Sequence, residues 1–259
     1  MTPTEPDALV VQLSAAGFVA AEDEAQELRT CAAIKGEPLD ALVERRLSGE
    51  PLAWITGQTL FCGLEIRIDR GVYVPRWQSE PLARRAVERL PTTGMGIDLC
   101  SGSGAIARMM ATSRPGARVV ASEIDEVAVA CAAGNGIEVY RGDLFSPLPR
   151  TITGLVDVVV GVVPYVPTTA LPMLSRDTFE FESELAYDGG PDGCGVLRRV
   201  AAESPGFLRL GGALLLELGG DQAEALTDDL SRSGFGDVTV LEDEEGDVRG
   251  IEATLEARK

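Results

Sequence analysis

Hydrophobic side chains recur every three or four positions through the first fifty residues. This spacing, within residues 5–48, is typical of short amphipathic helices. Gly17 and the stretch 35–38, Lys-Gly-Glu-Pro, interrupt the pattern, because glycine and proline end helices. We therefore expect a small helical domain at 1–50, which ends near Gly49-Glu-Pro51. The recurring apolar residues are Leu9, Val10, Leu13, Ala16, Ala25, Leu28, Ala32, Leu39, Leu42, Val43 and Leu47.

The period of the apolar residues changes to two after this domain. Leu64, Ile66 and Ile68 alternate with polar residues beside the turn Cys62-Gly63, and this pattern predicts a β-hairpin. A helical pattern follows near residues 80–90. We expect a β-hairpin linker at 51–74 and a larger third domain at 75–259.

Strand and helix signals alternate from residue 94 onward. Such alternation predicts an α/β fold with a mostly parallel, doubly wound sheet. The last two strand signals flank the acidic turn 243–247, so we expect them to form a hairpin with one antiparallel strand. The expected strands are 95–100, 117–123, 137–140, 156–161, 212–218, 237–242 and 248–256.

A glycine loop follows the first of these strands. Residues 98–104 are Asp-Leu-Cys-Ser-Gly-Ser-Gly, and a helical pattern begins at Ala105. A strand that turns through glycines into a helix lets backbone N–H groups approach a ligand closely. Glu123 ends the next strand, where a carboxylate suits the two hydroxyls of a ribose. Together the two features indicate a cofactor that contains adenosine.

Asp98 decides which adenosine cofactor is expected. The loop matches the dinucleotide pattern G-x-G-x-x-G only approximately, because Ala107 stands at the third glycine position. A carboxylate before the loop repels a pyrophosphate and attracts a cation. S-adenosylmethionine has no phosphate, and its amino group and sulfonium are positive, so we expect this cofactor. The alternative is a strand–helix turn that binds nothing.

Composition places the chain among ordinary globular proteins. It has 259 residues, 45% hydrophobic and 25% charged, and no apolar run approaches the roughly 20 residues that span a bilayer. Residues 1–7 are acidic and lack the basic and apolar pattern of a signal peptide. The five cysteines are scattered without a C-x-x-C pair. We expect reduced thiols, no metal site, no membrane partner and a cytoplasmic protein.

The net charge and the missing histidine limit the chemistry. A formal charge of −18 repels phosphate backbones, so we expect no direct nucleic-acid partner. The chain contains no histidine, which excludes imidazole as a general base. Hydrolysis by a Ser-His-Asp or Cys-His arrangement is excluded with it.

A second candidate site follows the strand expected at 156–161. Ligands in open α/β sheets lie beyond the carboxyl ends of the strands, where the strand order reverses. Pro164 and Tyr165 follow this strand, and we expect them to form a rigid wall for a planar acceptor group. The alternative is an ordinary loop after a strand.

Seven motifs occur in a fixed order along the chain. They are Glu50-Pro-Leu-Ala-Trp-Ile-Thr-Gly57, Phe61-Cys-Gly-Leu64, Val74-Pro-Arg76, Asp98 to Gly104, Gly142-Asp-Leu-Phe145, Pro164-Tyr-Val-Pro167 and Leu185 to Gly193. Together they resemble the HemK/PrmC family of protein-(glutamine-N5) methyltransferases, most of all its actinobacterial PrmC-related branch. The resemblance implies a class I S-adenosylmethionine-dependent methyltransferase fold with a Rossmann-like seven-stranded sheet. It also implies that the helical domain recognises the substrate and that the hairpin is a linker.

The resemblance further implies a cofactor site and an acceptor site. In the family the first aspartate and the glycines hold the methionine part of the cofactor. The glutamate takes the ribose hydroxyls, and a later aspartate lies near the adenine amino group. The implied cofactor-binding residues are Asp98, Cys100, Gly102, Gly104, Glu123, Ile124, Asp143, Leu144 and Phe145. The implied substrate-binding residues are Arg76, Trp77, Pro164 and Tyr165.

Val162 departs from the family pattern. The family has Asn-Pro-Pro-Tyr, or Asn-Val-Pro-Tyr in the related branch, and valine replaces this asparagine here. The asparagine side chain orients the acceptor amide, whereas valine offers only its backbone carbonyl. A buried amide without a partner costs about 1–3 kcal/mol, and a misplaced nucleophile slows the reaction further. We assign Val162, Pro164 and Tyr165 to the catalytic centre, with Glu182 and Glu184 as further polar candidates.

The sequence is compatible with four functions. The first is an N-methyltransferase that acts on a protein glutamine, with a peptide chain release factor as the candidate partner. The second is a methyltransferase for a metabolite or natural product, since Val162 makes the acceptor site more apolar. The third is a catalytically impaired protein that binds S-adenosylmethionine. Methylation of a nucleic-acid base is the fourth, and the charge and the missing amide both weaken it.

Overall fold

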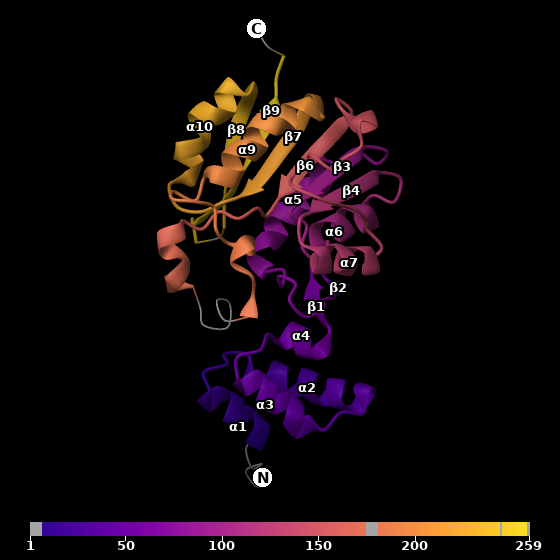
Figure 1. The fold of residues 1–259 in the computed structure, drawn as a ribbon, viewed down its shortest axis with the longest axis vertical. Coiled ribbons are helices and arrows are strands. Elements are labelled where there is room, and N and C mark those ends of the chain that lie inside the picture. Colours follow the sequence, from indigo (N-terminus) through magenta and orange to yellow (C-terminus); the bar gives the residue numbers. More distant parts are fainter. Residues whose placement is uncertain (1–6, 175–180, 244, 258–259) are drawn as a thin grey trace.

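The computed structural model describes residues 7–174, 181–243 and 245–257. The expectations for residues 1–6, for Glu244 in the acidic turn and for the last two residues lie outside these ranges. The molecule is long, with a helical unit at one end and a sheet unit at the other (Figure 1). The short strands β1 and β2 lie between the two units.

Four helices form the helical unit. Their apolar faces meet in one small core that contains Leu13, Leu28, Leu42 and Ile55. The helices are α1 (Ala8–Ala15), α2 (Ala21–Lys35), α3 (Leu39–Leu47) and α4 (Leu52–Thr56). The sequence did not predict α4, because five residues are too few to show a helical period. Pro51 stands before its first residue and starts this helix rather than marking the end of the helical region.

The predicted hairpin is present and packs toward the sheet unit. Strand β1 (Gln58–Phe61) pairs antiparallel with β2 (Leu64–Arg67) across the turn at residues 62–63. Phe61 and Ile66 are buried in the same core as Trp54 of α4. The Trp54 indole N–H also donates to the backbone oxygen of Val72 at 2.8 Å.

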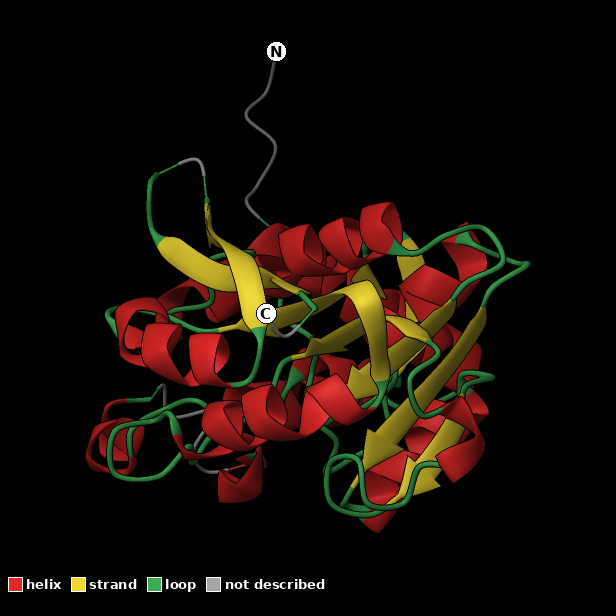
Figure 2. Cartoon of the chain, turned by 90° about the horizontal axis from the view of Figure 1, so that it is seen from above, coloured by secondary structure: helices red, strands yellow, loops and turns green. Residues whose placement is uncertain are grey.

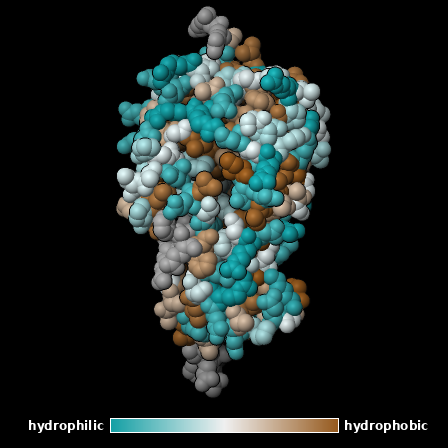
Figure 3. All heavy atoms as spheres, viewed as in Figure 1, coloured by the Kyte–Doolittle hydropathy of each residue, from teal (hydrophilic) through white to brown (hydrophobic). Residues whose placement is uncertain are grey.

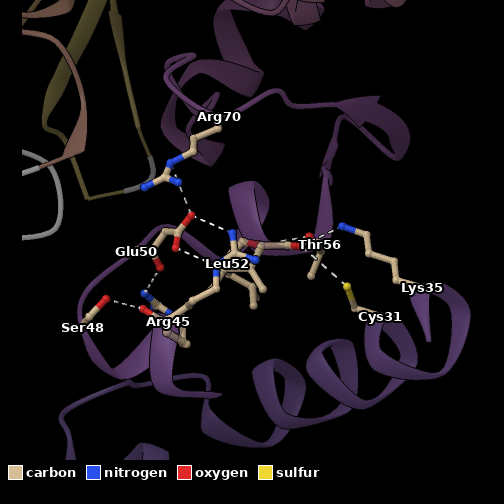
Figure 4. A network of polar contacts seen from close by, with 10 residues as sticks. Cys31, Lys35, Arg45, Ser48, Glu50, Leu52, Thr56 and Arg70 are labelled. Atoms are coloured by element: carbon tan, nitrogen blue, oxygen red, sulfur yellow. Dashed lines mark hydrogen bonds and ion pairs between the residues drawn. The ribbon is translucent and has the colours of Figure 1, made fainter. Parts of the chain in front are cut away.

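Glu50 joins the helical unit to the loop that follows β2. The residue is only 4% exposed, and its carboxylate accepts two hydrogen bonds from the Arg45 guanidinium at 2.8 and 2.7 Å. Arg70 approaches the same carboxylate at 3.8 Å, and Figure 4 shows the two arginines reaching it from different directions. Arg45 belongs to α3, whereas Arg70 lies between β2 and the sheet unit.

The sheet unit confirms the predicted α/β architecture. Its strands follow the order β5-β4-β3-β6-β7-β9-β8, and all pairs are parallel except those that involve β9. The last two strands form the predicted antiparallel hairpin. The strands are β3 (Met95–Leu99), β4 (Arg118–Glu123), β5 (Glu138–Arg141), β6 (Val156–Gly161), β7 (Leu208–Glu217), β8 (Phe235–Glu242) and β9 (Val248–Leu255).

Helices cover both faces of this sheet (Figure 2). Val158 and Val160 of β6 pack in the core that includes α5 and α6, whereas Val159 packs in the core that includes α9 and α10. A strand buried on both faces is apolar at consecutive positions, which explains the run of valines in β6. The helices are α5 (Glu80–Arg89), α6 (Ala105–Ser113), α7 (Glu126–Gly134), α9 (Gly195–Glu203) and α10 (Gln222–Arg232).

Candidate functional site

A cavity of about 260 Å³ lies beyond the carboxyl ends of β3, β4 and β6. The chain leaves β3 between its neighbours β4 and β6, so the cavity stands where the strand order reverses. We call it the first cavity. Its walls come from the glycine loop, the ends of β4 and β5, and residues after β2 and β6.

Asp98 is the most deeply buried carboxylate in the wall of the first cavity. It is 1% exposed, and its Oδ2 accepts a hydrogen bond from the Ala107 N–H of α6 at 2.9 Å. Among the described residues no arginine or lysine forms an ion pair with it. Burial, together with the charge of Glu123, raises the pKa of Asp98 to about 7. A cation in the cavity would relieve this cost.

Glu123 is held rigidly at the end of β4. Its Oε2 accepts the Gly102 N–H at 2.8 Å, and its Oε1 accepts the N–H groups of Ile124 and Asp125 at 2.7 and 2.9 Å. A carboxylate has about four positions that accept hydrogen bonds, so capacity remains for a ribose hydroxyl. These bonds also fix the glycine loop against β4.

The two glycines of the loop have different surroundings. Gly102 has φ of +55° and lines the first cavity, and a Cβ there would come no closer than 4.0 Å to another atom. Gly104 has φ of +78° and begins α6, and a Cβ there would lie 3.0 Å from Ile137 and 3.2 Å from Ala132. Gly104 is therefore needed for close packing and does not line the cavity.

Cys100 stands at a strained position in the same loop. Its φ of +52° lies in the left-handed region, which favours glycine. The side chain lines the first cavity, and burial raises the pKa of its thiol far above the ordinary value. The thiol therefore stays protonated and adds an apolar surface to the site.

Asn135 supports the loop from behind, and the sequence reasoning missed it. Its Nδ2 donates to the backbone oxygens of Ser103 and Arg67 at 2.8 and 2.9 Å, and its Oδ1 accepts the Arg67 N–H at 3.0 Å. This buried amide connects the glycine loop to β2. In the sequence it stands between Gly134 and Gly136, where an asparagine is also expected in a plain turn.

The residues implied for the adenine side divide into two groups. Ile124, Asp143 and Leu144 line the first cavity, and the half-exposed Asp143 is paired with Arg199 at 2.7 Å. Phe145 is 3% exposed and stacks on Phe207 in the core, with 4.8 Å between the ring centroids. The Phe145 ring therefore does not contribute to the cavity wall.

The expected acceptor residues Pro164 and Tyr165 also point in different directions. Val162 and Pro164 line the first cavity, whereas Tyr165 lines a second cavity of about 400 Å³. The Tyr165 hydroxyl donates to Glu217 Oε1 at 3.0 Å. Val162 lines both cavities, so it forms part of the wall between them.

Arg76 and Trp77 do not line the first cavity. Arg76 lines the second cavity, forms an ion pair with Glu182 at 2.6 Å and lies over the ring of Tyr73. Trp77 is 71% exposed. Glu182 is buried and also accepts the Val74 N–H and the Tyr187 hydroxyl, so it anchors one loop to another.

Charge distinguishes between the cofactors that the first cavity could hold. Its lining contains one arginine, Arg199, against five carboxylates. An excess of carboxylates disfavours a phosphate and favours the cationic groups of S-adenosylmethionine. The five are Asp98, Glu123, Asp125, Asp143 and Asp188.

The first cavity therefore fits S-adenosylmethionine. Asp98 would face its cationic end, and Glu123 would accept from its ribose. Gly102 leaves room for close approach, because no side chain projects there. When bound, this cofactor supplies an electrophilic methyl group.

No helix in the described part of the chain is long and apolar enough to cross a membrane. The same residues contain no group of three or more acidic or cysteine side chains that could hold a metal.

Comparisons with known proteins show relatives that are named methyltransferases. No family model matches the chain. It is 36% identical over 211 residues to a release factor glutamine methyltransferase of Geobacter sulfurreducens, covering 79% of this chain and 73% of that protein. It is also 36% identical over 225 residues to the protein of that name from Mycolicibacterium smegmatis, covering 84% and 79%.

A solved structure supports the fold. The chain matches a structure of the E. cuniculi Mtq2–Trm112 complex, which methylates the eRF1 translation termination factor. The TM-score is 0.52 at 20% identity, with coverage of 72% of this chain and 99% of that one. At this identity the match concerns the arrangement of strands and helices alone.

Proposed function

Because this chain belongs to the family of release factor glutamine methyltransferases, we propose that it methylates the side-chain amide of a glutamine in a release factor. It is a methyltransferase with S-adenosylmethionine as its methyl donor. The observation that carries the proposal is the acidic first cavity, which adjoins a second cavity across a wall formed by Val162, Tyr73 and Ala186. A donor and an acceptor can approach each other across such a wall.

The chain's own residues hold the reactants in this proposal. Asp98 and Glu123 orient the donor from β3 and β4. Pro164 stiffens the acceptor side, and the backbone carbonyl of Val162 accepts a hydrogen bond from the attacking amide. Methyl transfer needs the nucleophile in line at about 3–3.5 Å, so positioning supplies much of the rate enhancement. No histidine is needed, because the amide proton can leave to a carbonyl or to water.

We place the chain in the actinobacterial PrmC-related branch, which the Mycolicibacterium relative supports. Residues 1–50 would recognise the substrate, residues 75–259 would catalyse methyl transfer, and residues 51–74 would link these two domains. A release factor acts in translation, so the reaction would take place in the cytoplasm.

Transfer of labelled methyl to a purified bacterial release factor tests this function. We expect transfer by the unaltered chain and by Val162→Asn, with kcat/KM values within about tenfold of each other. Transfer by Val162→Asn alone would show that the natural acceptor is a different molecule, and metabolites would then be screened. Transfer by neither would contradict the proposed function, and binding of S-adenosylmethionine would then separate a silent binding protein from an unfolded one.

A further inference from the structure

Two buried polar atoms without partners lie on either side of the wall between the cavities. Among the described residues, Ser79 Oγ and Glu217 Oε2 form no hydrogen bond, although both are shielded from solvent. Ser79 lines the first cavity and Glu217 lines the second. Folded proteins leave few buried polar groups unpaired, and each costs about 1–3 kcal/mol. Such a pair next to a reaction site therefore points to a missing ligand group.

The two side chains are neighbours. Burial raises the pKa of Glu217, and the Ser79 hydroxyl lies near enough to oppose part of this rise, although no hydrogen bond of normal geometry joins the atoms. Glu217 is 6% exposed at the end of β7, and its other oxygen is occupied by the Tyr165 hydroxyl. Ser79 ends the short 3₁₀ turn Trp77–Ser79 before α5. Two elements distant in sequence thus bring a donor and an acceptor together.

Three residues line both cavities and mark the passage between them. They are Tyr73, Val162 and Ala186. Of these three side chains, only the Tyr73 hydroxyl can accept a hydrogen bond from an amide N–H. Burial and the neighbouring carboxylates raise the pKa of Tyr73 to about 12, so it stays a neutral phenol. The carboxylate of Glu217 is the stronger acceptor for an amide N–H.

We propose that Glu217 and Ser79 bind the carboxamide of the acceptor and together replace the amide side chain that position 162 lacks. Glu217 Oε2 accepts an N–H of the acceptor, and the Ser79 hydroxyl donates to its carbonyl oxygen. A primary amide has two N–H donors and a carbonyl acceptor, so it matches both atoms. The assignment rests on the proposed function, since it presumes a carboxamide acceptor.

The decisive variant is Glu217→Gln. Glutamine keeps one oxygen for Tyr165 and places an NH₂ group where Oε2 stands, so a donor would face the donor of the substrate. With a purified bacterial release factor and labelled S-adenosylmethionine, we expect kcat/KM to fall at least tenfold. Ser79→Ala should cause a loss of similar size. Affinity for S-adenosylmethionine, measured by calorimetry, should change less than twofold in both and confirms that each variant is folded.

Rescue separates direct binding from a merely structural role. Val162→Asn in the Glu217→Gln background restores an amide at the wall, so we expect it to recover at least tenfold in kcat/KM. Tyr165→Phe is the matched control, because it removes the Tyr165–Glu217 hydrogen bond and leaves the carboxylate in place. If Glu217→Gln and Tyr165→Phe lower kcat/KM equally, and Val162→Asn does not restore activity to Glu217→Gln, then Glu217 only positions Tyr165. That result would overturn the assignment.

The outcomes also distinguish this assignment from the function on which it rests. If the unaltered chain transfers methyl groups, and Glu217→Gln and Ser79→Ala do so with the same kcat/KM, the assignment is overturned but the proposed function stands. No transfer by either the unaltered chain or Val162→Asn would overturn the proposed function and the assignment with it.

Discussion

At the scale of a single residue, we expect Asp98 to make cofactor binding depend on pH. Its pKa of about 7 arises from burial beside Glu123, and a cation stabilises its charged form. We expect affinity for S-adenosylmethionine to rise as the pH rises through about 7, by at most tenfold per pH unit. Asp98→Asn should lose at least tenfold in affinity and abolish this slope. Calorimetric titrations at several pH values measure both effects.

The same carboxyl group should destabilise the free protein. A folded pKa above the ordinary 3.8 contributes stability at low pH, which is lost as the pH rises through about 7. Asp98→Asn should therefore melt at a higher temperature than the unaltered chain at pH 8 when no cofactor is present. Asp143→Asn, at a half-exposed carboxylate of the same cavity, is the control and should keep the slope of affinity with pH. A flat affinity profile in the unaltered chain would contradict the role of Asp98.

The glycine loop between β3 and α6 is the element on which the first cavity depends. Both Gly102 and Gly104 have positive φ, but only Gly104 is closely packed against Ile137 and Ala132. We expect Gly104→Ala to lower the free energy of unfolding by about 2–4 kcal/mol through backbone strain and overpacking. Gly102→Ala should cost about 1 kcal/mol, from backbone strain alone. Urea denaturation measures both, and equal losses would show that packing behind Gly104 is unimportant.

Elements with a strong local pattern could be predicted from the sequence. The strands β3, β4 and β6 were expected within one residue of their observed bounds, because they are apolar and bounded by turn residues. Helix α4 could not be predicted in this way, because its five residues are held in place by contacts of Ile55 with the other helices of the helical unit. Its existence depends on tertiary packing.

Only part of the site could be predicted from the sequence, because some of its residues are brought together by tertiary contacts. Asp98 and Glu123 could be found, because strand ends and loop motifs place them by local rules. Asn135 could not, since its partner Arg67 lies 68 residues away along the chain. Ser79 and Glu217 are ordinary residues in the sequence, and only the fold brings them to the two cavities that Val162 lines. Local motifs also could not show that Phe145 and Tyr165 turn away from the first cavity.

At the scale of the whole molecule, Glu50 holds the helical unit against the loop after β2 (Figure 4). The Arg45 guanidinium holds the pKa of Glu50 below its ordinary value of 4.5. We expect Glu50→Gln to lower the free energy of unfolding by about 1–2 kcal/mol at neutral pH, because a buried, charge-assisted pair is lost. Chemical denaturation at several pH values measures the loss.

The stability that Glu50 contributes depends on pH. A lowered folded pKa contributes stability above the ordinary value, and the contribution is lost as the pH falls through the folded pKa. The unaltered chain and Glu50→Gln should therefore converge in acid. Glu138→Gln breaks an exposed pair with Arg118 and should cost less than about 1 kcal/mol. A larger loss in Glu138→Gln than in Glu50→Gln would contradict the role of Glu50.

The surface agrees with the composition. In the view of Figure 3 hydrophilic residues predominate, and the hydrophobic ones appear in small groups. The formal charge of −18 keeps polyanions away and favours partners with a basic surface. Long-range attraction of this kind is screened by salt, so encounter with such a partner slows as ionic strength rises.

The wall at Val162 has a consequence for how such an enzyme can diverge. Val162 borders both cavities together with Tyr73 and Ala186, while the carboxylates expected to hold the donor come from β3 and β4. We therefore expect a mutation at position 162 to change which nucleophile is accepted, while the carboxylates of β3 and β4 stay in place. New acceptor chemistry can be explored one substitution at a time, on a scaffold that keeps its cofactor. This makes position 162 the natural place to begin when retargeting the enzyme by design.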